Sequence, residues 1–342
     1  MMHHDFESGV AIAVDDPSQV GEVRRTANAL ASSIGLSSTD AGHFAILASE
    51  AATNISKHAG RGEIMMRSID TPQGPRGAEL VAIDSGPGIG DIDRAFSDGY
   101  STTGSSGTGL GAMSRLATTF DIYTTPGSGT VLAARITPGR RTPMAVRADF
   151  QIGVVRVAKR GEVACGDDWR LVMNQNGRAM LAVADGLGHG QAAADASRRA
   201  VEIAGERSSE QPAMIITHVH AALRSTRGAA VAVAEVRADH RSVRYAGLGN
   251  IAGTIVSPRE SKSLVSHNGI AGHEMRKVQE FSYDWASDAL LVLHSDGLSS
   301  RWDLGKYPGL TTRDPSVIAG VLYRDFSRGR DDSLVVVIRA AA

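Results

Sequence analysis

Four aspartates in the second half of the 342-residue chain stand beside apolar segments. They are Asp167 in CGDDW, Asp185 in VADGLGHG, Asp296 in HSDGL and Asp331 in GRDDSLVVV. Three of them lie at the end or start of an expected strand, where sheet packing can hold a carboxylate rigidly. Converging carboxylates without basic partners repel one another, and a shared divalent cation removes that repulsion. A single Asp-Gly pair is typical of a turn, so the prediction of a metal site depends on the whole set.

Polar side chains also recur on one helical face in the first half of the chain. The segment LASEAATNISKHAG carries Glu50, Asn54 and His58 at positions i, i+4 and i+8, which share one face of a helix. A carboxylate, an amide and an imidazole on an inner helix face need a polar ligand, so Asn54 and His58 are candidate cofactor-binding residues. A solvated helix face is the alternative explanation of the same pattern.

Two glycine-containing segments follow that helix, and the first begins at Asp84, directly after the apolar run LVAI. An Asp at a strand end can accept a hydrogen bond from an amine such as that of adenine, while Gly86 and Gly88 let a ring lie against the backbone. The second segment, GSSGTGLG, opens an expected helix, where glycine N–H groups can bind a phosphate. A turn and a flexible loop are the alternative interpretations. The candidate phosphate ligands are Gly107, Thr108, Gly109, Leu110 and Gly111.

The elements that position these residues differ between the two halves. Apolar spacing predicts helices over 17–34, 40–58 and 112–119, and strands over 63–69, 79–83, 120–124 and 129–136. This order predicts helices on one face of a mixed sheet. The second half contains more strands, expected over 150–158, 170–174, 179–184, 229–237, 242–247, 253–257, 289–294 and 334–339, with helices over 190–205 and 212–224. That order predicts an α/β sandwich.

The stretch TPGRRTPMAVR between the halves has prolines, a glycine and arginines but no apolar period, which is typical of a linker. We therefore expect one domain over 1–137, a linker over 138–148 and a second domain over 149–342. Lys and Arg number 36 against 37 Asp and Glu, so no strong field attracts nucleic acid or an anionic membrane.

A single cysteine, Cys165, excludes an internal disulfide. The longest apolar runs are far shorter than the roughly 20 residues that cross a bilayer, and the start MMHHDFESG lacks the features of a signal peptide. We expect a cytoplasmic protein that binds neither nucleic acid nor a membrane.

The order of the polar motifs in the first half resembles the nucleotide-binding boxes of the GHKL ATPase and kinase superfamily, over about residues 11–136. The motifs are Glu-x3-Asn on a helix, Asp-x-Gly-x-Gly after a strand, a glycine-rich segment and Gly-x-Gly-Thr at 127–130. The anti-sigma and switch kinases of RsbT and RsbW type are most similar. This resemblance implies a Bergerat-type α/β sandwich that binds ATP with Mg²⁺.

The same resemblance assigns roles to individual residues of this sequence. It implies that Asn54 holds Mg²⁺ against the phosphates and that Asp84 binds the adenine amine, with Thr130 nearby. Gly107, Gly109 and Gly111 would wrap the phosphate tail. Glu50 would orient or deprotonate the attacking hydroxyl, for which a carboxylate beside the phosphates is chemically suited.

The aspartate motifs of the second half, over about residues 150–339, resemble those of the SpoIIE/PP2C-type serine/threonine phosphatases, most of all the short RsbX type. The resemblance implies a PP2C-like α/β/β/α sandwich with two Mn²⁺ or Mg²⁺ ions, in which Asp185 bridges both ions and the Gly186 carbonyl is a further ligand. Asp167, Asp296 and Asp331 would complete the centre, without a covalent phosphoenzyme. Asp168 and Asp332 remain alternatives to their neighbours, because strand alternation turns only one of each pair inward.

Together the two resemblances imply a bifunctional regulator of a bacterial partner-switching pathway. It would phosphorylate and dephosphorylate a STAS-type partner, such as an anti-sigma-factor antagonist or a stressosome-like protein. Two alternatives concern the first half: an RsbW-like module that binds a sigma factor, or a nucleotide sensor that controls the phosphatase. A downstream phosphatase is a further possible partner.

Overall fold

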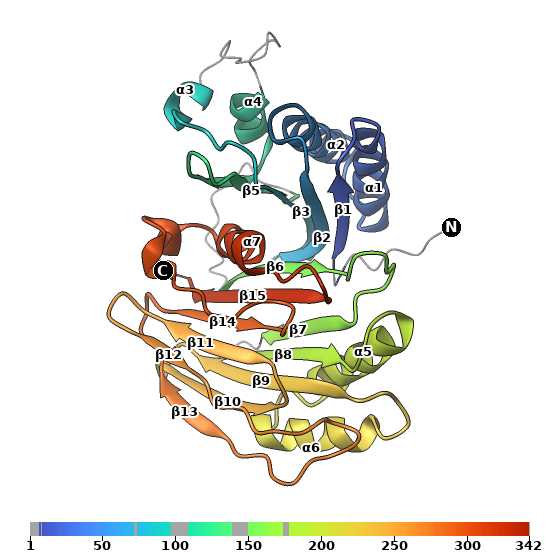
Figure 1. Ribbon diagram of the computed structural model, residues 1–342, viewed down its shortest axis with the longest axis vertical. Coiled ribbons are helices and arrows are strands. Elements are labelled where there is room, and N and C mark those ends of the chain that lie inside the picture. Colours follow the sequence, from blue (N-terminus) through green and yellow to red (C-terminus); the bar gives the residue numbers. More distant parts are fainter. Residues whose placement is uncertain are drawn as a thin grey trace. The chain divides into compact units, whose positions relative to one another are not determined.

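The computed structural model describes residues 7, 9–71, 74–96, 109–138, 150–173 and 178–341. The chain forms two compact units (Figure 1). Unit 1 comprises Met1–Arg147 with Tyr307–Arg324, and unit 2 comprises Ala148–Lys306 with Asp325–Ala342. The boundary expected from the sequence differs in one respect, since it assigned residues 307–324 to the second half. No helix in the described part of the chain is both long and apolar enough to span a bilayer.

Unit 1 contains a five-stranded sheet in the order β1-β2-β3-β5-β4, in which every neighbouring pair is antiparallel. The expectation of a mixed sheet is therefore wrong for the described strands. The strands are β1 Val10–Val14, β2 Gly62–Thr71, β3 Gly74–Asp84, β4 Thr119–Thr124 and β5 Thr130–Ile136. The helices of the first half are α1 Gln19–Ser33, α2 Ser38–Asn54, a π-helical turn Ile55–Ala59, α3 Ile92–Phe96 and α4 Gly109–Leu116.

The two faces of this sheet are covered by different parts of the chain. On one face Ile64 and Leu80 join the apolar side chains of α1 and α2, such as Leu30 and Leu47, in one buried cluster. Because side chains alternate along a strand, residues one step away point to the other face. On that second face five apolar side chains are also buried: Met65, Val81, Ile83, Val131 and Ala133.

The second face is covered by a helix from the far end of the sequence, α7 Pro315–Phe326. A Cβ added at Gly320 would lie 2.5 Å from Val131 Cγ1 and 3.3 Å from Ile83 Cδ1, so the glycine lets this helix approach the sheet closely. Residues 315–322 of α7 are all buried. Helices thus cover both faces of the unit 1 sheet.

Unit 2 is built from two five-stranded sheets whose order is β7-β8-β9-β10-β13 and β6-β15-β14-β11-β12. Apolar side chains from both sheets form one buried cluster, and α5 Gln191–Glu206 and α6 Pro212–Ala222 pack on the first sheet, so the predicted α/β sandwich is confirmed. The first sheet contains β7 Asp167–Met173, β8 Arg178–Gly186, β9 Ala229–Arg237, β10 Ser242–Leu248 and β13 Phe281–Asp284. The second contains β6 Phe150–Val157, β11 Ala252–Val256, β12 Ser261–Ser263, β14 Leu290–His294 and β15 Ser333–Ala340. Two 3-10 turns, Leu304–Lys306 and Leu310–Thr312, precede α7.

Strand pairing in unit 2 determines where the aspartates lie. In the β7–β8 ladder Asp167 pairs directly with Asp185. In the other sheet β14 pairs with β15, so Asp296 follows one strand and Asp331 precedes its neighbour. Each sheet therefore presents two of the predicted aspartates at a strand end.

Candidate functional sites

The unit 2 site is built around two facing carboxylates, Asp167 and Asp185. Asp167 is 1% exposed, and the Ser295 hydroxyl donates to its Oδ2 over 2.6 Å. The Gly186 N–H donates to the Gly166 carbonyl over 3.0 Å and so fixes the loop after Asp185 against the loop before Asp167. Contacts from both sheets therefore hold this pair in place.

The electrostatics of the site show that the predicted aspartates gather together. Burial, followed by the charges of Asp296, Asp331 and Asp332, raises the pKa of Asp185 to about 7. Burial is also the main reason that the pKa of Asp167 lies well above its ordinary value, and the charges of Asp185 and Asp332 add to it. The four predicted aspartates thus lie close enough to repel one another, together with Asp332.

The two neighbours Asp331 and Asp332 have different surroundings. Asp332 is 4% exposed, its Oδ1 accepts the Lys159 N–H over 2.8 Å, and its Oδ2 lies against Gly166. Asp331 is exposed, and its Oδ1 accepts the Asp332 N–H over 3.0 Å. The structure therefore brings Asp332 into the site, a residue that the sequence analysis left as an alternative. Asp168 is buried as well, beside Asp167.

Two further side chains orient the loop after β14. Asn250 Nδ2 donates to Asp296 Oδ2 over 2.6 Å, although the sequence analysis did not assign Asn250 to the site. The buried His294 contacts the Ser295 carbonyl through Nδ1 (2.8 Å) and receives the Trp302 Nε1–H at Nε2 (3.2 Å). Burial lowers the pKa of His294, which favours the neutral ring that accepts at Nε2.

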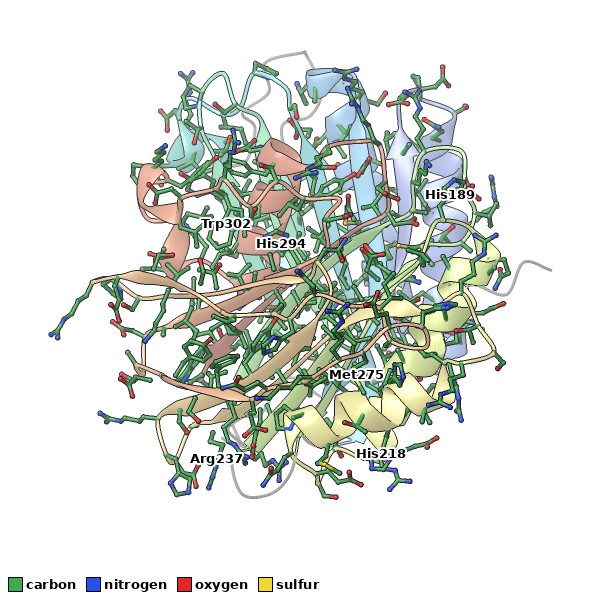
Figure 2. All side chains as sticks on the ribbon, turned by 60° about the horizontal axis from the view of Figure 1, so that its bottom comes forward. His189, His218, Arg237, Met275, His294 and Trp302 are labelled. Atoms are coloured by element: carbon green, nitrogen blue, oxygen red, sulfur yellow. The ribbon has the colours of Figure 1, made fainter. Side chains whose placement is uncertain are left out.

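The loop after Asp185 carries an exposed ion pair. His189 Nδ1 lies 2.6 Å from Glu162 Oε1, which belongs to the segment between β6 and β7 (Figure 2). The guanidinium of Arg227 approaches the same loop at Gly188. His189 and Gly188 thus lie on the loop that begins with the Asp185 motif, and Glu162 and Arg227 contact this loop from other segments.

The donor set of unit 2 fits hard divalent cations. No three Asp, Glu, His or Cys side chains within the described ranges are already arranged as the shell of one metal ion. The set is nevertheless composed of carboxylate oxygens, which Mg²⁺ and Mn²⁺ prefer. Its members raise one another's pKa, and the charge of Asp331 likewise raises the pKa of Asp332. A bound dication would relieve this repulsion.

The unit 1 site is centred on Asp84 at the end of β3. Asp84 Oδ1 accepts the N–H groups of Gly86 (2.8 Å) and Thr130 (3.3 Å), while Oδ2 accepts no hydrogen bond from the described residues. Burial raises the pKa of Asp84, although these bonds and the nearby charges of Arg324 and His58 act in the opposite direction. Oδ2 is therefore the atom that a ligand amine can reach.

Two sequence motifs meet around Asp84. The Gly127 N–H donates to the Pro87 carbonyl over 2.8 Å, which joins the Asp-x-Gly-x-Gly and Gly-x-Gly-Thr segments. Gly129 has φ of +82°, and a Cβ there would overlap the Asp84 carbonyl oxygen, so only glycine fits. Of the residues predicted around the ring, the structure brings together Asp84, Gly86, Gly88 and Thr130.

The polar face of α2 meets the start of α4. A Cβ added at Gly109 would lie 3.7 Å from both Asn54 Oδ1 and Glu50 Oε2. His58 is exposed in the π-helical turn after α2. In α4 Gly111 is buried and Leu110 packs against the apolar core, so any phosphate contact by Leu110 would use its backbone. The predicted ligands Gly107 and Thr108 lie outside the described residues.

Comparisons with known proteins match the first and the second part of the sequence separately. The family model described as histidine kinase-like ATPase domain matches residues 13–136, and the model of stage II sporulation protein E (SpoIIE) matches residues 175–340. Serine/threonine-protein kinase RsbT of Bacillus subtilis (strain 168) is 34% identical over 111 residues, which cover 32% of this chain and 83% of RsbT. Phosphoserine phosphatase RsbX of the same strain is 26% identical over 151 residues, which cover 44% of this chain and 75% of RsbX.

One chain from a structural study of the bacterial stressosome is also similar. Its TM-score is 0.52 at 27% identity, and the match covers 56% of this chain and 99% of that one. The protein therefore belongs, through the first part of its sequence, to the histidine kinase-like ATPase family that includes RsbT, and it joins this domain to a PP2C-type phosphatase domain of the SpoIIE family.

Proposed function

We propose that this protein is a bifunctional regulator of a partner-switching pathway in the cytoplasm. Unit 1 phosphorylates a serine or threonine on a STAS-type protein, an anti-sigma-factor antagonist or a stressosome-like protein, and unit 2 removes that phosphate. The observation that supports the proposal most is the presence of two chemically distinct sites in one chain, around Asp84 and around Asp185. The similarity of the two halves to a kinase and a phosphatase supports the same pairing.

In unit 1 each polar group suits one part of ATP. Asp84 Oδ2 accepts the adenine amine, because Oδ1 is already occupied by two backbone N–H groups. Asn54 would hold Mg²⁺, which neutralises phosphate charge when it is bound. Glu50, whose carboxylate lies with Asn54 beside Gly109 at the start of α4, accepts the proton of the attacking hydroxyl.

In unit 2 the carboxylates bind metal and their neighbours orient them. Asp167, Asp185, Asp296 and Asp331, with the Gly186 carbonyl and with Asp332 beside them, would hold two Mn²⁺ or Mg²⁺ ions, which activate water and neutralise developing charge when bound. The remaining polar groups act on these ligands directly. Ser295 and Asn250 hold the Asp167 and Asp296 side chains in place by hydrogen bonds to one oxygen of each carboxylate.

The test uses the full-length protein, radiolabelled ATP, Mg²⁺ and Mn²⁺, and purified STAS proteins. Asp185→Asn protein should transfer label to a STAS protein and leave it there. Glu50→Gln protein should transfer no label but should release phosphate from a previously phosphorylated STAS protein. Each variant thus isolates one activity.

Glu22→Gln, an exposed change on α1, is the matched control and should behave as the wild type. Absence of label on every STAS protein with the Asp185→Asn variant would disprove the kinase half. Absence of Mn²⁺-dependent release by the Glu50→Gln variant would disprove the phosphatase half.

A further inference from the structure

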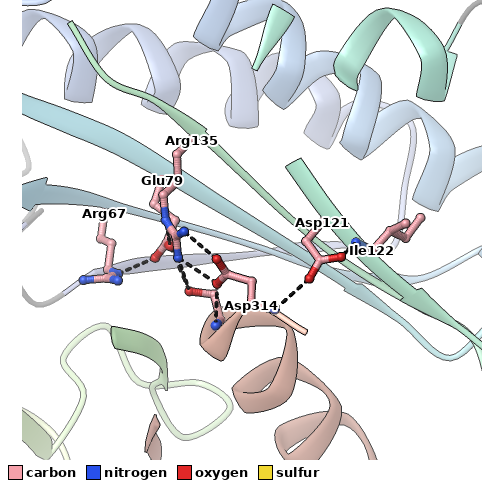
Figure 3. Close-up of polar contacts among 7 residues, drawn as sticks. Arg67, Glu79, Asp121, Ile122, Arg135 and Asp314 are labelled. Atoms are coloured by element: carbon pink, nitrogen blue, oxygen red, sulfur yellow. Dashed lines mark hydrogen bonds and ion pairs between the residues drawn. The ribbon is translucent and has the colours of Figure 1, made fainter. Parts of the chain in front are cut away.

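The helix that covers the second face of the unit 1 sheet begins in a buried network of charges (Figure 3). Glu79 on β3 is 1% exposed and accepts the Nε–H groups of Arg67 (2.5 Å) and Arg135 (2.6 Å). Arg135 then donates from both Nη atoms to Asp314, over 2.5 and 2.8 Å. The Ser316 hydroxyl donates to Glu79 over 2.8 Å. The first turn of α7 is therefore attached to both β3 and β5.

The middle and the end of α7 contact strand residues next to Asp84 and Thr130, which belong to the proposed adenine site. Gly320 packs against Ile83 and Val131, which precede Asp84 and follow Thr130 in the sequence. Near the end of the helix, Tyr323 hydrogen-bonds to Glu63, a direct strand partner of Ile83. The charge of Arg324 also acts on Asp84. One helix thus extends from the buried Glu79 to the residues that flank Asp84.

The chain connections of α7 lead to the aspartates of the phosphatase. The segment 307–324 belongs to unit 1, but the chain before and after it, up to Lys306 and from Asp325, belongs to unit 2. In the sequence, Asp296 comes shortly before the segment 307–324, and Asp331 and Asp332 come shortly after it. Any change in the position or order of α7 is therefore passed by covalent continuity to segments that carry metal-site carboxylates.

We infer that α7 couples the two sites, so that nucleotide bound at Asp84 orders the return segment 325–332 and its two aspartates. The inference rests on the proposed function, because it requires nucleotide in unit 1 and a carboxylate centre in unit 2. Nucleotide that fixes Asp84 and Thr130 also fixes Ile83 and Val131, against which Gly320 packs. A helix held by buried ion pairs moves as one body with its sheet, so ordering reaches its far end.

Hydrogen exchange of the full-length protein at constant Mg²⁺, with and without ADP, tests this inference. In the wild type, ADP should slow exchange around α2 and should slow exchange of residues 325–332 at least fivefold. The variants Ser316→Ala and Asp314→Asn should keep the ADP effect around α2 and lose most of it at 325–332. Ser316→Ala removes only one hydroxyl, so it can still test the inference if the loss of charge in Asp314→Asn unfolds unit 1. Glu22→Gln should reproduce the wild type.

Three results would overturn the inference in distinguishable ways. Protection around α2 with unchanged exchange at 325–332 in the wild type would show that nucleotide binds without coupling, and the proposed function would stand. Unchanged exchange in both places would remove nucleotide binding itself and the coupling with it. Equal protection at 325–332 in the wild type and both variants would show that the α7 anchor does not transmit the effect.

Discussion

At the scale of single residues, Asp84 shows how backbone contacts prepare a carboxylate for one ligand. Two N–H groups occupy Oδ1, so the orientation of Oδ2 is fixed before any ligand arrives. We expect Asp84→Asn to weaken ATP binding at least tenfold, because an amide nitrogen cannot accept the adenine amine. Titration with a fluorescent ATP analogue measures this, with Glu22→Gln as the control. Equal affinity of the variant and the wild type would contradict the assignment of Asp84.

Asp185 illustrates the cost of keeping carboxylates together before metal binds. Burial and three neighbouring acids raise its pKa to about 7, so its charge opposes folding in the metal-free protein. We expect Asp185→Asn to raise the Tm of metal-free unit 2 and to abolish the additional stabilisation by Mn²⁺. Scanning calorimetry with and without Mn²⁺ checks both effects. Asp288→Asn, an exposed change in the same unit, is the control. If metal-free Asp185→Asn protein had a lower Tm than the wild type, repulsion between Asp185 and its neighbouring acids would be contradicted.

Most of the aspartates of the unit 2 site could be predicted from the sequence, but their arrangement in space could not. Asp167, Asp185 and Asp296 could be selected because each stands beside an apolar run with glycine as its neighbour. The choice between Asp331 and Asp332 could not be made by strand alternation, since β15 begins only at Ser333. Asn250 lies far from Asp296 in the sequence, and only the fold brings them together.

At the scale of secondary structure, regular periodicity predicted many of the strands and the helices of unit 1. The expected strands 120–124 and 129–136 correspond to β4 and β5, and the expected helix 40–58 corresponds to α2 with its π-helical turn. The prediction missed β1 Val10–Val14 and α7. The sequence of α7, PSVIAGVLYRDF, is nearly continuous in apolar residues at its start, because the helix is buried on several sides and lacks a polar face.

The Glu79 network gives unit 1 a specific dependence on pH. Burial alone would raise the pKa of Glu79, but the charges of Arg67 and Arg135 and the Ser316 hydroxyl lower it below its ordinary value. A carboxyl group with a lowered pKa stabilises the fold above its unfolded pKa of about 4.5, and this contribution is lost as the pH falls through the lower folded pKa.

We therefore expect Glu79→Gln to destabilise unit 1 at pH 7 by about 3–5 kcal/mol, because Arg67 and Arg135 both lose the buried carboxylate between them. Between about pH 5 and pH 3 the wild type should lose more stability than the variant, since only the wild type has this carboxylate to protonate. Thermal unfolding across this range, following the transition that ATP shifts, measures both effects. Parallel pH profiles for the two proteins would contradict the role of Glu79.

At the scale of the whole molecule, the compact units do not follow the order of the sequence. The linker-like composition near residues 138–148 suggested a single division, yet residues 307–324 group with unit 1. A sequence pattern indicates that a helix is amphipathic or buried, but it does not indicate which sheet buries it. Here the deciding contacts join Glu79 and Arg135 to Asp314 and Ser316, more than 170 positions apart in the sequence.

A fragment that ends at the expected linker should therefore fold poorly. Residues 1–147 alone would expose Met65, Val81 and Val131, which are buried in the complete chain, and would leave Arg135 without Asp314. We expect this fragment to aggregate or to unfold at a lower temperature than unit 1 of the full-length protein, because it exposes a contiguous apolar sheet face.

A synthetic peptide of residues 307–326 should restore the stability and the solubility of the fragment. The same peptide with Asp314→Asn should restore less, since it lacks the paired carboxylate; a fragment that is monomeric and as stable as unit 1 without any peptide would show that α7 is not required. Light scattering and thermal unfolding of the fragment, alone and with each peptide, distinguish these outcomes.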